Sequence, residues 1–228
     1  SLRVIKYGSS TGNEVWNVTY GGPNASDYNY GQSASVDPLS GNVYIAAVSH
    51  VTVSTTTHYR YRTLEYVSST GAISWNQSYD APTSLDNEAA HAVISDSSGN
   101  AYVAGTVDCC VFPYVRVIKY NNAGTLQWTA TSSGGTFVEG YGVAVDSSSN
   151  VYITGDSTET NGTGFKLFKY NTSGALQWFS RLYTRFDNYV NTGAHVIDRD
   201  SSNNIYIAGE ADSEGSVYAD FLALSYDS

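Results

Sequence analysis

The chain has 228 residues, of which 41% are hydrophobic and 14% aromatic, and its net charge is −10. This composition supports a buried core and excludes an intrinsically disordered chain. The excess of acidic residues argues against nucleic acid and anionic lipid as partners, and no apolar run of about 18 residues is present to span a membrane as a helix.

The composition also indicates a compartment. Lys and Arg are few, Tyr numbers 20, and Ser, Thr and Asn are abundant, which favours an extracellular or cell-surface protein. The sequence starts at Ser1, contains no Met and shows no signal peptide, so we interpret it as a mature or excised segment. Five Asn-x-Ser/Thr sequons are predicted glycosylation sites: Asn17, Asn24, Asn76, Asn161 and Asn171.

A repeat runs through the chain, beginning with the segment VIKYGSSTGNEVW. Its Tyr, Gly-containing turn and Trp recur in four copies, which end at Trp16, Trp75, Trp128 and Trp178. A second block, SVDPLSGNVYIAA in its first copy, places Tyr44, Tyr102, Tyr152 and Tyr206 at matching positions. The period of about 50–58 residues is typical of repeat architectures.

Each repeat contains four predicted strands, which we call a, b, c and d in chain order. In one copy they read YGVAVD, NVYITG, FKLFKY and ALQWFS. β-branched and aromatic residues alternate with polar ones between turn residues, a pattern that predicts strands. The corner between a and b carries an Asp in every copy, which we expect to cap a hairpin turn: Asp37, Asp96, Asp146 and Asp200.

No segment shows a sustained helical period, so the predicted fold class is all-β. Four antiparallel strands at this period predict a β-propeller with four blades of four strands, or a four-blade portion of a larger propeller. The b strands, together with the Tyr and Trp residues of strands c and d, should form the core between blades.

The blocks VAVDSSSNVYITG and FKLFKYNTSGALQW resemble the beta-propeller repeat common in secreted bacterial proteins. The resemblance covers nearly the whole chain in four copies and implies blade architecture. It implies no catalytic residues, because these repeats occur in surface proteins that share no reaction. The chain departs from the pattern in a long insertion at residues 48–60 and in an adjacent pair of cysteines.

A single domain is predicted over residues 1–228, and its terminal portions are expected to complete one blade between them. The repeats span approximately residues 1–29, 30–88, 89–139, 140–192 and 193–228. Strands a, b and d each occur four times, whereas strand c occurs five times, because the chain both starts and ends on a c strand.

The last c strand lies in the segment DFLALSYDS, and its apolar residues are Phe221, Leu222, Leu224 and Tyr226. Three outcomes are open for it. The strand can close a ring with the N-terminal strands, continue into a longer propeller array, or be donated to a neighbouring copy in a head-to-tail filament.

One face of the predicted propeller carries the candidate ligand residues. Acidic residues occupy corresponding places on the d–a loops, and two His residues lie where strand a starts, at the position held by Gln32 and Tyr141 in the other copies. The candidates are Asp27, Asp86, Glu139, Asp187, His91 and His195. Such a face suits Ca²⁺, which prefers oxygen ligands, or a glycan. The alternative is that the Asp residues only cap loops.

Two further features break the repeat. Cys109 and Cys110 are adjacent, which leaves a vicinal disulfide, bridges to a partner, or free thiols as alternatives. Asp198 and Arg199 stand in the last strand a, where other copies carry small or apolar residues.

These observations predict a secreted, non-enzymatic structural or adhesive module, glycosylated, whose partners are other copies of itself. No zinc-protease, EF-hand or nucleophile-elbow motif is present, and the acidic residues recur in each copy whereas catalysis needs one asymmetric constellation. The alternative is a glycan- or Ca²⁺-binding propeller, and a glycosidase ranks third because its two carboxylates need a defined separation. No cofactor is expected apart from the Ca²⁺ of the alternative.

Overall fold

A computed structural model describes residues 1–22, 28–53, 56–80, 87–108, 113–132, 138–159, 162–185, 193–212 and 219–226. Every element in these ranges is a β-strand, and every strand pairing is antiparallel, which confirms the all-β class. Accordingly, the described ranges contain no helix able to span a bilayer.

The strands form five sheets. The hairpin sheet contains β1 (Leu2–Tyr7) and β2 (Glu14–Tyr20). Sheet I contains β3 (Tyr28–Val36), β4 (Val43–Val53), β5 (Thr56–Tyr66) and β6 (Ile73–Tyr79). Sheet II contains β7 (Asn87–Ser95), β8 (Ala101–Asp108), β9 (Tyr114–Tyr120) and β10 (Leu126–Thr131). Sheet III contains β11 (Val138–Val145), β12 (Val151–Glu159), β13 (Gly162–Tyr170) and β14 (Leu176–Arg185). The C-terminal sheet contains β15 (Gly193–Arg199), β16 (Ile205–Asp212) and β17 (Ala219–Tyr226).

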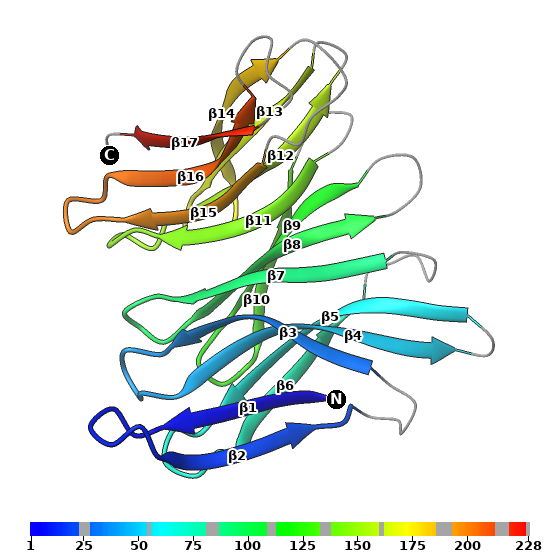
Figure 1. The fold of residues 1–228 in the computed structure, drawn as a ribbon, viewed down its shortest axis with the longest axis vertical. Helices are drawn as coiled ribbons and strands as arrows, with labels where there is room; N and C mark the ends of the chain where they lie inside the picture. The colour runs from blue at the N-terminus through cyan, green and yellow to red at the C-terminus, as the bar shows by residue number, and fades with distance from the viewer. Residues whose placement is uncertain are drawn as a thin grey trace.

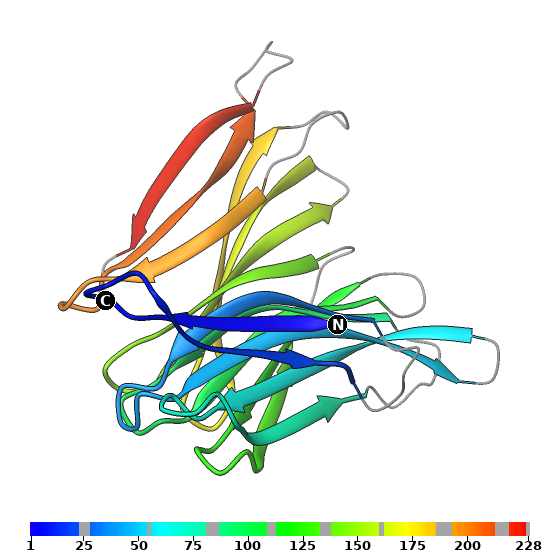
Figure 2. The same ribbon diagram turned by 60° about the horizontal axis from the view of Figure 1, so that its bottom comes forward.

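The sheets are stacked face to face along the longest axis of the molecule (Figure 1). Successive sheets are turned relative to one another, so that the strands of the C-terminal sheet run steeply across those of sheet I (Figure 2). The a strands β3, β7, β11 and β15 contact one another in succession and line one edge of the stack, which we call the inner edge.

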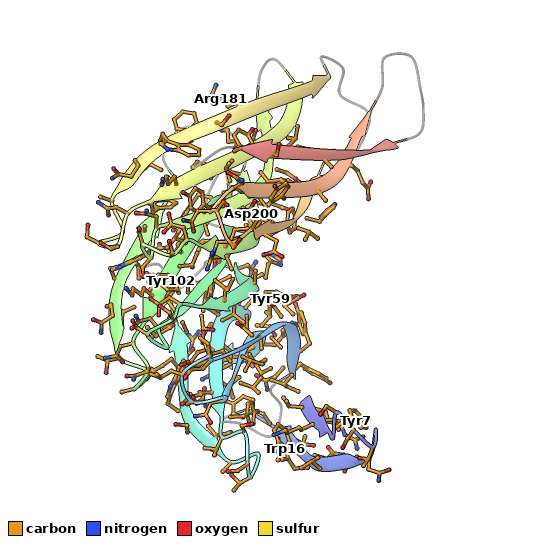
Figure 3. All side chains as sticks on the ribbon, turned by 90° about the vertical axis from the view of Figure 1, so that its left-hand side faces the viewer. Tyr7, Trp16, Tyr59, Tyr102, Arg181 and Asp200 are labelled. Atoms are coloured by element: carbon orange, nitrogen blue, oxygen red, sulfur yellow. The ribbon has the colours of Figure 1, made fainter. Side chains whose placement is uncertain are left out.

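The two c strands at the ends of the chain lie in incomplete sheets. β17 pairs with β16 as the third strand of the C-terminal sheet, and β1 pairs with β2 alone. Among the described strands, none joins the hairpin sheet to the C-terminal sheet. In Figure 3, Tyr7 of the hairpin sheet is labelled near the bottom of the molecule and Asp200, in the turn between β15 and β16, is labelled in its upper half.

The Asp corners cap their turns as predicted. Asp146 accepts hydrogen bonds from the backbone N–H groups of Ser148 and Asn150, from the Asn150 amide and from the Tyr152 hydroxyl. Asp96 and Asp200 repeat this set of bonds in their own sheets. The Asp, Asn and Tyr of these three corners are therefore a structural unit, whereas Asp37 accepts from the backbone N–H groups of Leu39 and Ser40 and from the Ser40 hydroxyl.

Tryptophans of the d strands join each sheet to the next. The indole N–H of Trp16 donates to the Ser68 carbonyl at 2.9 Å, and the indole N–H groups of Trp75 and Trp128 make the same bond to the following sheet. In each case a glycine of the acceptor turn, at positive φ, lies against the indole ring: Gly71, Gly124 and Gly174.

Tyrosines fill the interfaces between sheets. Those of the b strands, Tyr44, Tyr102 and Tyr152, are buried in clusters shared with the following sheet. Those of the c strands, Tyr66, Tyr120 and Tyr170, are buried in clusters shared with the preceding sheet. The core thus lies between sheets, in the b strands and the aromatic residues of c and d, as the repeat predicts.

Candidate functional site

Each a strand carries a β-bulge at the same place. The pairing register shifts across one residue in β3, β7, β11 and β15, and the skipped residues are Gln32, His91, Tyr141 and His195. A bulge changes the direction of a side chain and is frequent beside functional sites. Sequence reasoning placed these four residues at equivalent positions but did not predict the bulge.

Glycines of the b strands accommodate the bulges. A Cβ atom on Gly155 would lie 1.8 Å from the carbonyl oxygen of Glu139, just before the bulge in β11. Gly105 and Gly209 meet the equivalent carbonyls of Ala89 and Gly193 at 1.9 and 1.8 Å. Only a residue without a side chain permits so close an approach between the two backbones.

Three of the four bulge residues, His91, Tyr141 and His195, form a row of rings along the inner edge. The ring centroids of His91 and Tyr141 are 5.3 Å apart, and those of Tyr141 and His195 are 5.4 Å apart. The Tyr141 hydroxyl donates a hydrogen bond to the Glu139 carboxylate. Burial, and then this carboxylate, raise the pKa of Tyr141, so the hydroxyl stays protonated at neutral pH.

The residue that follows the b-strand glycine links neighbouring sheets. The backbone N–H of Ala194, beside the bulge in β15, donates to Asp156 Oδ1 at 2.9 Å. One interface earlier, the backbone N–H of Gly140 donates to Thr106 Oγ1 at 3.2 Å. Asp156 therefore occupies a position where a neutral hydroxyl performs the same structural task.

The carboxyl group of Asp156 has an unusual proton affinity. Burial raises its pKa to about 7, although the hydrogen bond from Ala194 opposes this, and the nearby Glu139 and Glu210 raise it further. The folded protein therefore binds more protons than the unfolded chain between about pH 4 and pH 7, and folding stability falls as the pH rises through this window.

Asp156→Asn is expected to remove this pH dependence, because an amide oxygen can still accept from Ala194 but cannot ionise. Near pH 8 the melting temperature should rise by at least about 2–4 °C, the shift that 1 kcal/mol produces in a chain of this size. Near pH 4 the two proteins should melt alike. Asp198→Asn, at an exposed carboxylate, is the control. Parallel melting curves for wild type and Asp156→Asn across this range would contradict the assignment.

A cavity of about 360 Å³ opens beside the ring row. Residues of β3, β5, β7, β8 and β11 line it, and we call it the inner pocket: Tyr30, Tyr59, Asn87, Glu88, Ala89, His91, Thr106, Asp108, Glu139 and Tyr141. Burial lowers the pKa of His91, against the influence of Glu139, so its imidazole is neutral at pH 7.

The structure brings together part of the predicted ligand face. Glu139 and His91 line the inner pocket, and His195 contacts Tyr141 one sheet further on. Asp27, Asp86, Asp187, Cys109 and Cys110 lie outside the described residues. Within the described ranges, no group of three or more His, Cys, Asp and Glu residues is arranged to hold a metal ion.

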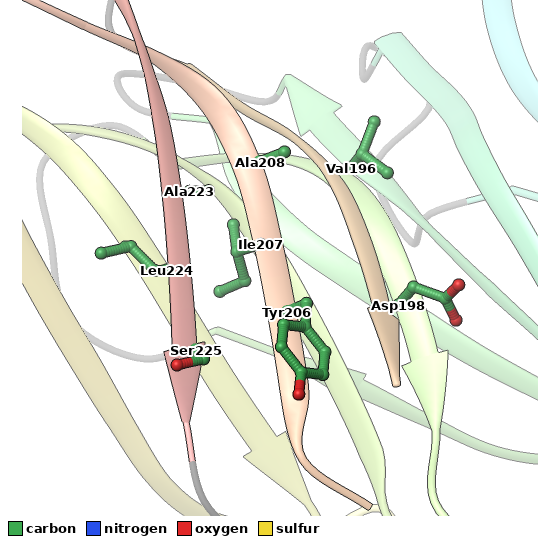
Figure 4. A pocket seen from close by; sticks show the side chains of 8 residues that line it. All are labelled: Val196, Asp198, Tyr206, Ile207, Ala208, Ala223, Leu224 and Ser225. Carbon is green, nitrogen blue, oxygen red and sulfur yellow. The ribbon is translucent and has the colours of Figure 1, made fainter. Parts of the chain in front are cut away.

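A second concave surface lies on the C-terminal sheet, on the face turned away from sheet III. Its cavity also measures about 360 Å³ and is lined mainly by apolar residues of β15, β16 and β17. Val196, Asp198 and Tyr206 project from this face (Figure 4). Leu224 and Tyr226 of the last strand instead pack against the cluster shared with sheet III, while the side chains of Phe221 and Leu222 lie outside the described residues.

Three of the five sequons are described. Asn17 on β2 and Asn76 on β6 occupy equivalent places on d strands, and Asn76 is exposed. Asn171 lies in a c–d turn, where its side-chain oxygen accepts from the backbone N–H groups of Ser173 and Ala175. Asn24 and Asn161 fall outside the described residues.

Antiparallel four-stranded sheets, stacked by their faces with the a strands along one edge, are the arrangement of propeller blades. Residues 133–163 match the beta-propeller repeat family, which confirms the resemblance seen in the repeated blocks. None of the curated proteins matches the sequence.

Two solved structures are similar in fold. A protein of unknown function from Dyadobacter fermentans aligns with a TM-score of 0.59 at 11% identity, over 86% of this chain and 51% of its own. An apocarotenoid oxygenase from Synechocystis aligns with a TM-score of 0.52 at 11% identity, over 98% of this chain and 53% of its own. The chain thus spans about half the length of these structures, and at this identity the likeness shows the fold alone.

Proposed function

We propose that the chain is a secreted, non-enzymatic structural or adhesive module of propeller blades, which joins head to tail with further copies of itself through its two end sheets. The five sequons and the scarcity of Lys and Arg support the extracellular setting and glycosylation. One structural observation carries the assembly: each end sheet exposes one half of the interface that is buried between all the sheets inside the chain.

The exposed half at the C-terminal end belongs to strands a and b. Tyr206 is 47% exposed, whereas its counterparts Tyr44, Tyr102 and Tyr152 are buried against the next sheet. Val196, beside it on β15, is 60% exposed. We call this surface the tail face.

The exposed half at the N-terminal end belongs to strands c and d. Tyr7 is 58% exposed, whereas its counterparts Tyr66, Tyr120 and Tyr170 are buried against the preceding sheet. Val4, Trp16 and Val18 of the hairpin pack toward sheet I, so the alternation of a strand directs Arg3, Ile5 and Tyr7 to the other side. We call that side the head face.

The two faces are complementary in the kind of surface that they present and in charge. Inside the chain, a surface of the tail type always packs on a surface of the head type. The head face also carries the exposed cation Arg3, and the tail face carries the exposed carboxylate Asp198. A head-to-tail contact between copies is heterologous, so it produces a closed ring or a filament according to its rotation.

The edge of β17 adds backbone groups to the same joint. In each complete sheet a fourth strand pairs with strand c, whereas β17 ends its sheet on one side. A strand from a neighbouring copy could pair there by β-augmentation.

The joint should be weak and dependent on concentration. Burial of three large apolar side chains contributes about 1.5–3 kcal/mol each. The loss of translational and rotational freedom on association costs on the order of 4–15 kcal/mol, which is of the same size. Hydrogen bonds at the β17 edge would therefore decide how tight the joint is.

Val196→Asp is expected to abolish self-association, because it places a charge in the middle of the tail face. Tyr7→Asp should do the same at the head face. Since each variant keeps one intact face, a mixture of the two should form a heterodimer and nothing larger. Sedimentation velocity over a range of concentrations measures the association of each variant alone and of the mixture.

Leu39→Asp is the matched control, since Leu39 is an exposed apolar residue in a turn outside both faces. It should associate like the wild type. A wild type that stays monomeric at about 1 mM, or unchanged association of Val196→Asp, would contradict the proposal.

A further inference from the structure

The c–d turns carry a repeated binding site for an indole ring. In sheet I the turn places Gly71 against the ring of Trp16, and the Ser68 carbonyl accepts from its indole N–H at 2.9 Å. The c–d turns of sheets II and III receive Trp75 and Trp128 in the same way. A turn of this kind therefore binds the indole of the preceding sheet through one carbonyl oxygen and one glycine, whose lack of a side chain admits the ring.

The c–d turn of the hairpin sheet has the same construction. Residues 9–12 and residues 68–71 both read SSTG. In each turn the glycine N–H donates to the carbonyl four residues earlier at 2.8 Å, and the φ angles of Gly12 and Gly71 are +67° and +72°. A Cβ atom on Gly71 would lie 2.9 Å from an indole ring, whereas one on Gly12 would meet no described atom within 4 Å. The Gly12 turn is thus an indole site formed in advance, with the Ser9 carbonyl as its acceptor.

Trp178 is the indole that matches this site. It holds the same place on its d strand as the other three tryptophans, but it is 39% exposed, and among the described residues its indole N–H has no acceptor. Its ring centroid lies 6.2 Å from that of Tyr152, so the indole is on the face of sheet III that is turned toward the C-terminal sheet. No described c–d turn lies against it, since β17 is the last described strand on that side of its sheet.

Trp178 also borders the surface on which a second copy is proposed to pack. Two residues further along the same face of β14, Ser180 Oγ lies 3.4 Å from the hydroxyl of Tyr226, near the end of β17. Trp178 is therefore beside the outer edge of β17, and no described strand separates it from a copy that packs on the tail face. The Gly12 turn directly follows β1, which carries Tyr7 of the head face, so the docking hairpin brings both to the joint.

We propose that the Gly12 turn of one copy binds Trp178 of the copy on whose tail face it packs, with the Ser9 carbonyl accepting from the indole N–H. The inference rests on the proposed head-to-tail assembly and names the residues that give the joint its direction. The hairpin sheet and β14 lie at opposite ends of the molecule (Figure 1), so in this structure the two halves of the contact can meet only between copies.

Trp178→Ala is expected to raise the Kd of self-association about tenfold or more, because tryptophans buried at interfaces carry a large share of the binding energy. Gly12→Ala should raise it about tenfold, since the new methyl group would press on the indole, as it would at Gly71. Each variant keeps the other half of the contact intact. An equimolar mixture of the two should therefore form a heterodimer with the Kd of the wild type, as measured by sedimentation velocity over a range of concentrations.

Two matched controls separate the contact from general effects on folding. Phe179→Ala removes a ring that is 40% exposed, but this ring packs toward Phe168 on the opposite face of β14. Gly41→Ala adds a methyl group at a glycine whose φ is +75° and whose Cβ would meet no described atom within 4 Å, in a turn outside both faces. Both controls should associate like the wild type, and thermal melting should show that all four variants are folded.

The outcomes separate this inference from the proposed function. If Val196→Asp abolishes association but Trp178→Ala and Gly12→Ala associate like the wild type, the assembly stands and the indole contact is refuted. Equal weakening by Phe179→Ala and Trp178→Ala, or a mixture that associates no better than its components, would also overturn the contact. A wild type that stays monomeric at about 1 mM would overturn both the contact and the assembly.

Discussion

Trp75→Ala should cost about 3–5 kcal/mol of folding free energy, since it removes a large buried side chain from the interface between sheets I and II. The Trp75 ring is 9% exposed and lies between Tyr44 and Tyr120, with ring centroids at 5.6 and 5.8 Å. Its indole N–H donates to the Asn122 carbonyl at 3.2 Å. Truncation therefore opens a cavity, leaves the Asn122 carbonyl without its donor and removes the ring against which the Gly124 turn packs.

Trp178→Ala provides the control at the equivalent position of another copy of the repeat. Trp178 occupies the equivalent position on β14 but is 39% exposed, so truncation there removes far less buried surface. Urea unfolding at constant pH should show a loss for Trp178→Ala less than half that for Trp75→Ala. Equal losses in the two variants would mean that the packing of the Trp ring on the c–d turn of the next sheet is not what stabilises the stack.

Much of this interface could be predicted from sequence alone, because its parts recur. The spacing of Trp75 and Trp128 predicted the d strands, and the Asp96 and Asp146 corners predicted the a–b turns that the hydrogen bonds confirm. Repetition also placed Glu139 and His91 on one face, and the inner pocket brings them together, although Glu139 was predicted in a d–a loop and lies within β11.

The bulges could not be predicted in this way. A bulge depends on the pairing of one strand with another, and the alternation within β11 alone does not reveal which residue is skipped. The available signal was a pair of small residues around the skipped position, such as Gly140 and Gly142, combined with a glycine on strand b. The raised pKa of Asp156 could not be predicted for a related reason, because the surroundings of its carboxyl group are formed by the neighbouring β15.

Gly155→Ala should destabilise the protein by about 1–3 kcal/mol, because it forces a methyl group into the carbonyl oxygen of Glu139. Sheet I carries Ala47 at the equivalent position, opposite Gly31, so the bulge carbonyl can be displaced far enough to admit a methyl group. In sheet III the same displacement would move Glu139 and Tyr141, which form one wall of the inner pocket.

The substitution should therefore lower the melting temperature by about 2–4 °C per kcal/mol of lost stability. Gly21→Ala is the control, because a Cβ there meets no atom within 4 Å and the φ angle of Gly21 is not positive. It should leave the melting temperature unchanged. If Gly155→Ala melted like the wild type, the close approach of the two backbones would not be what fixes the bulge.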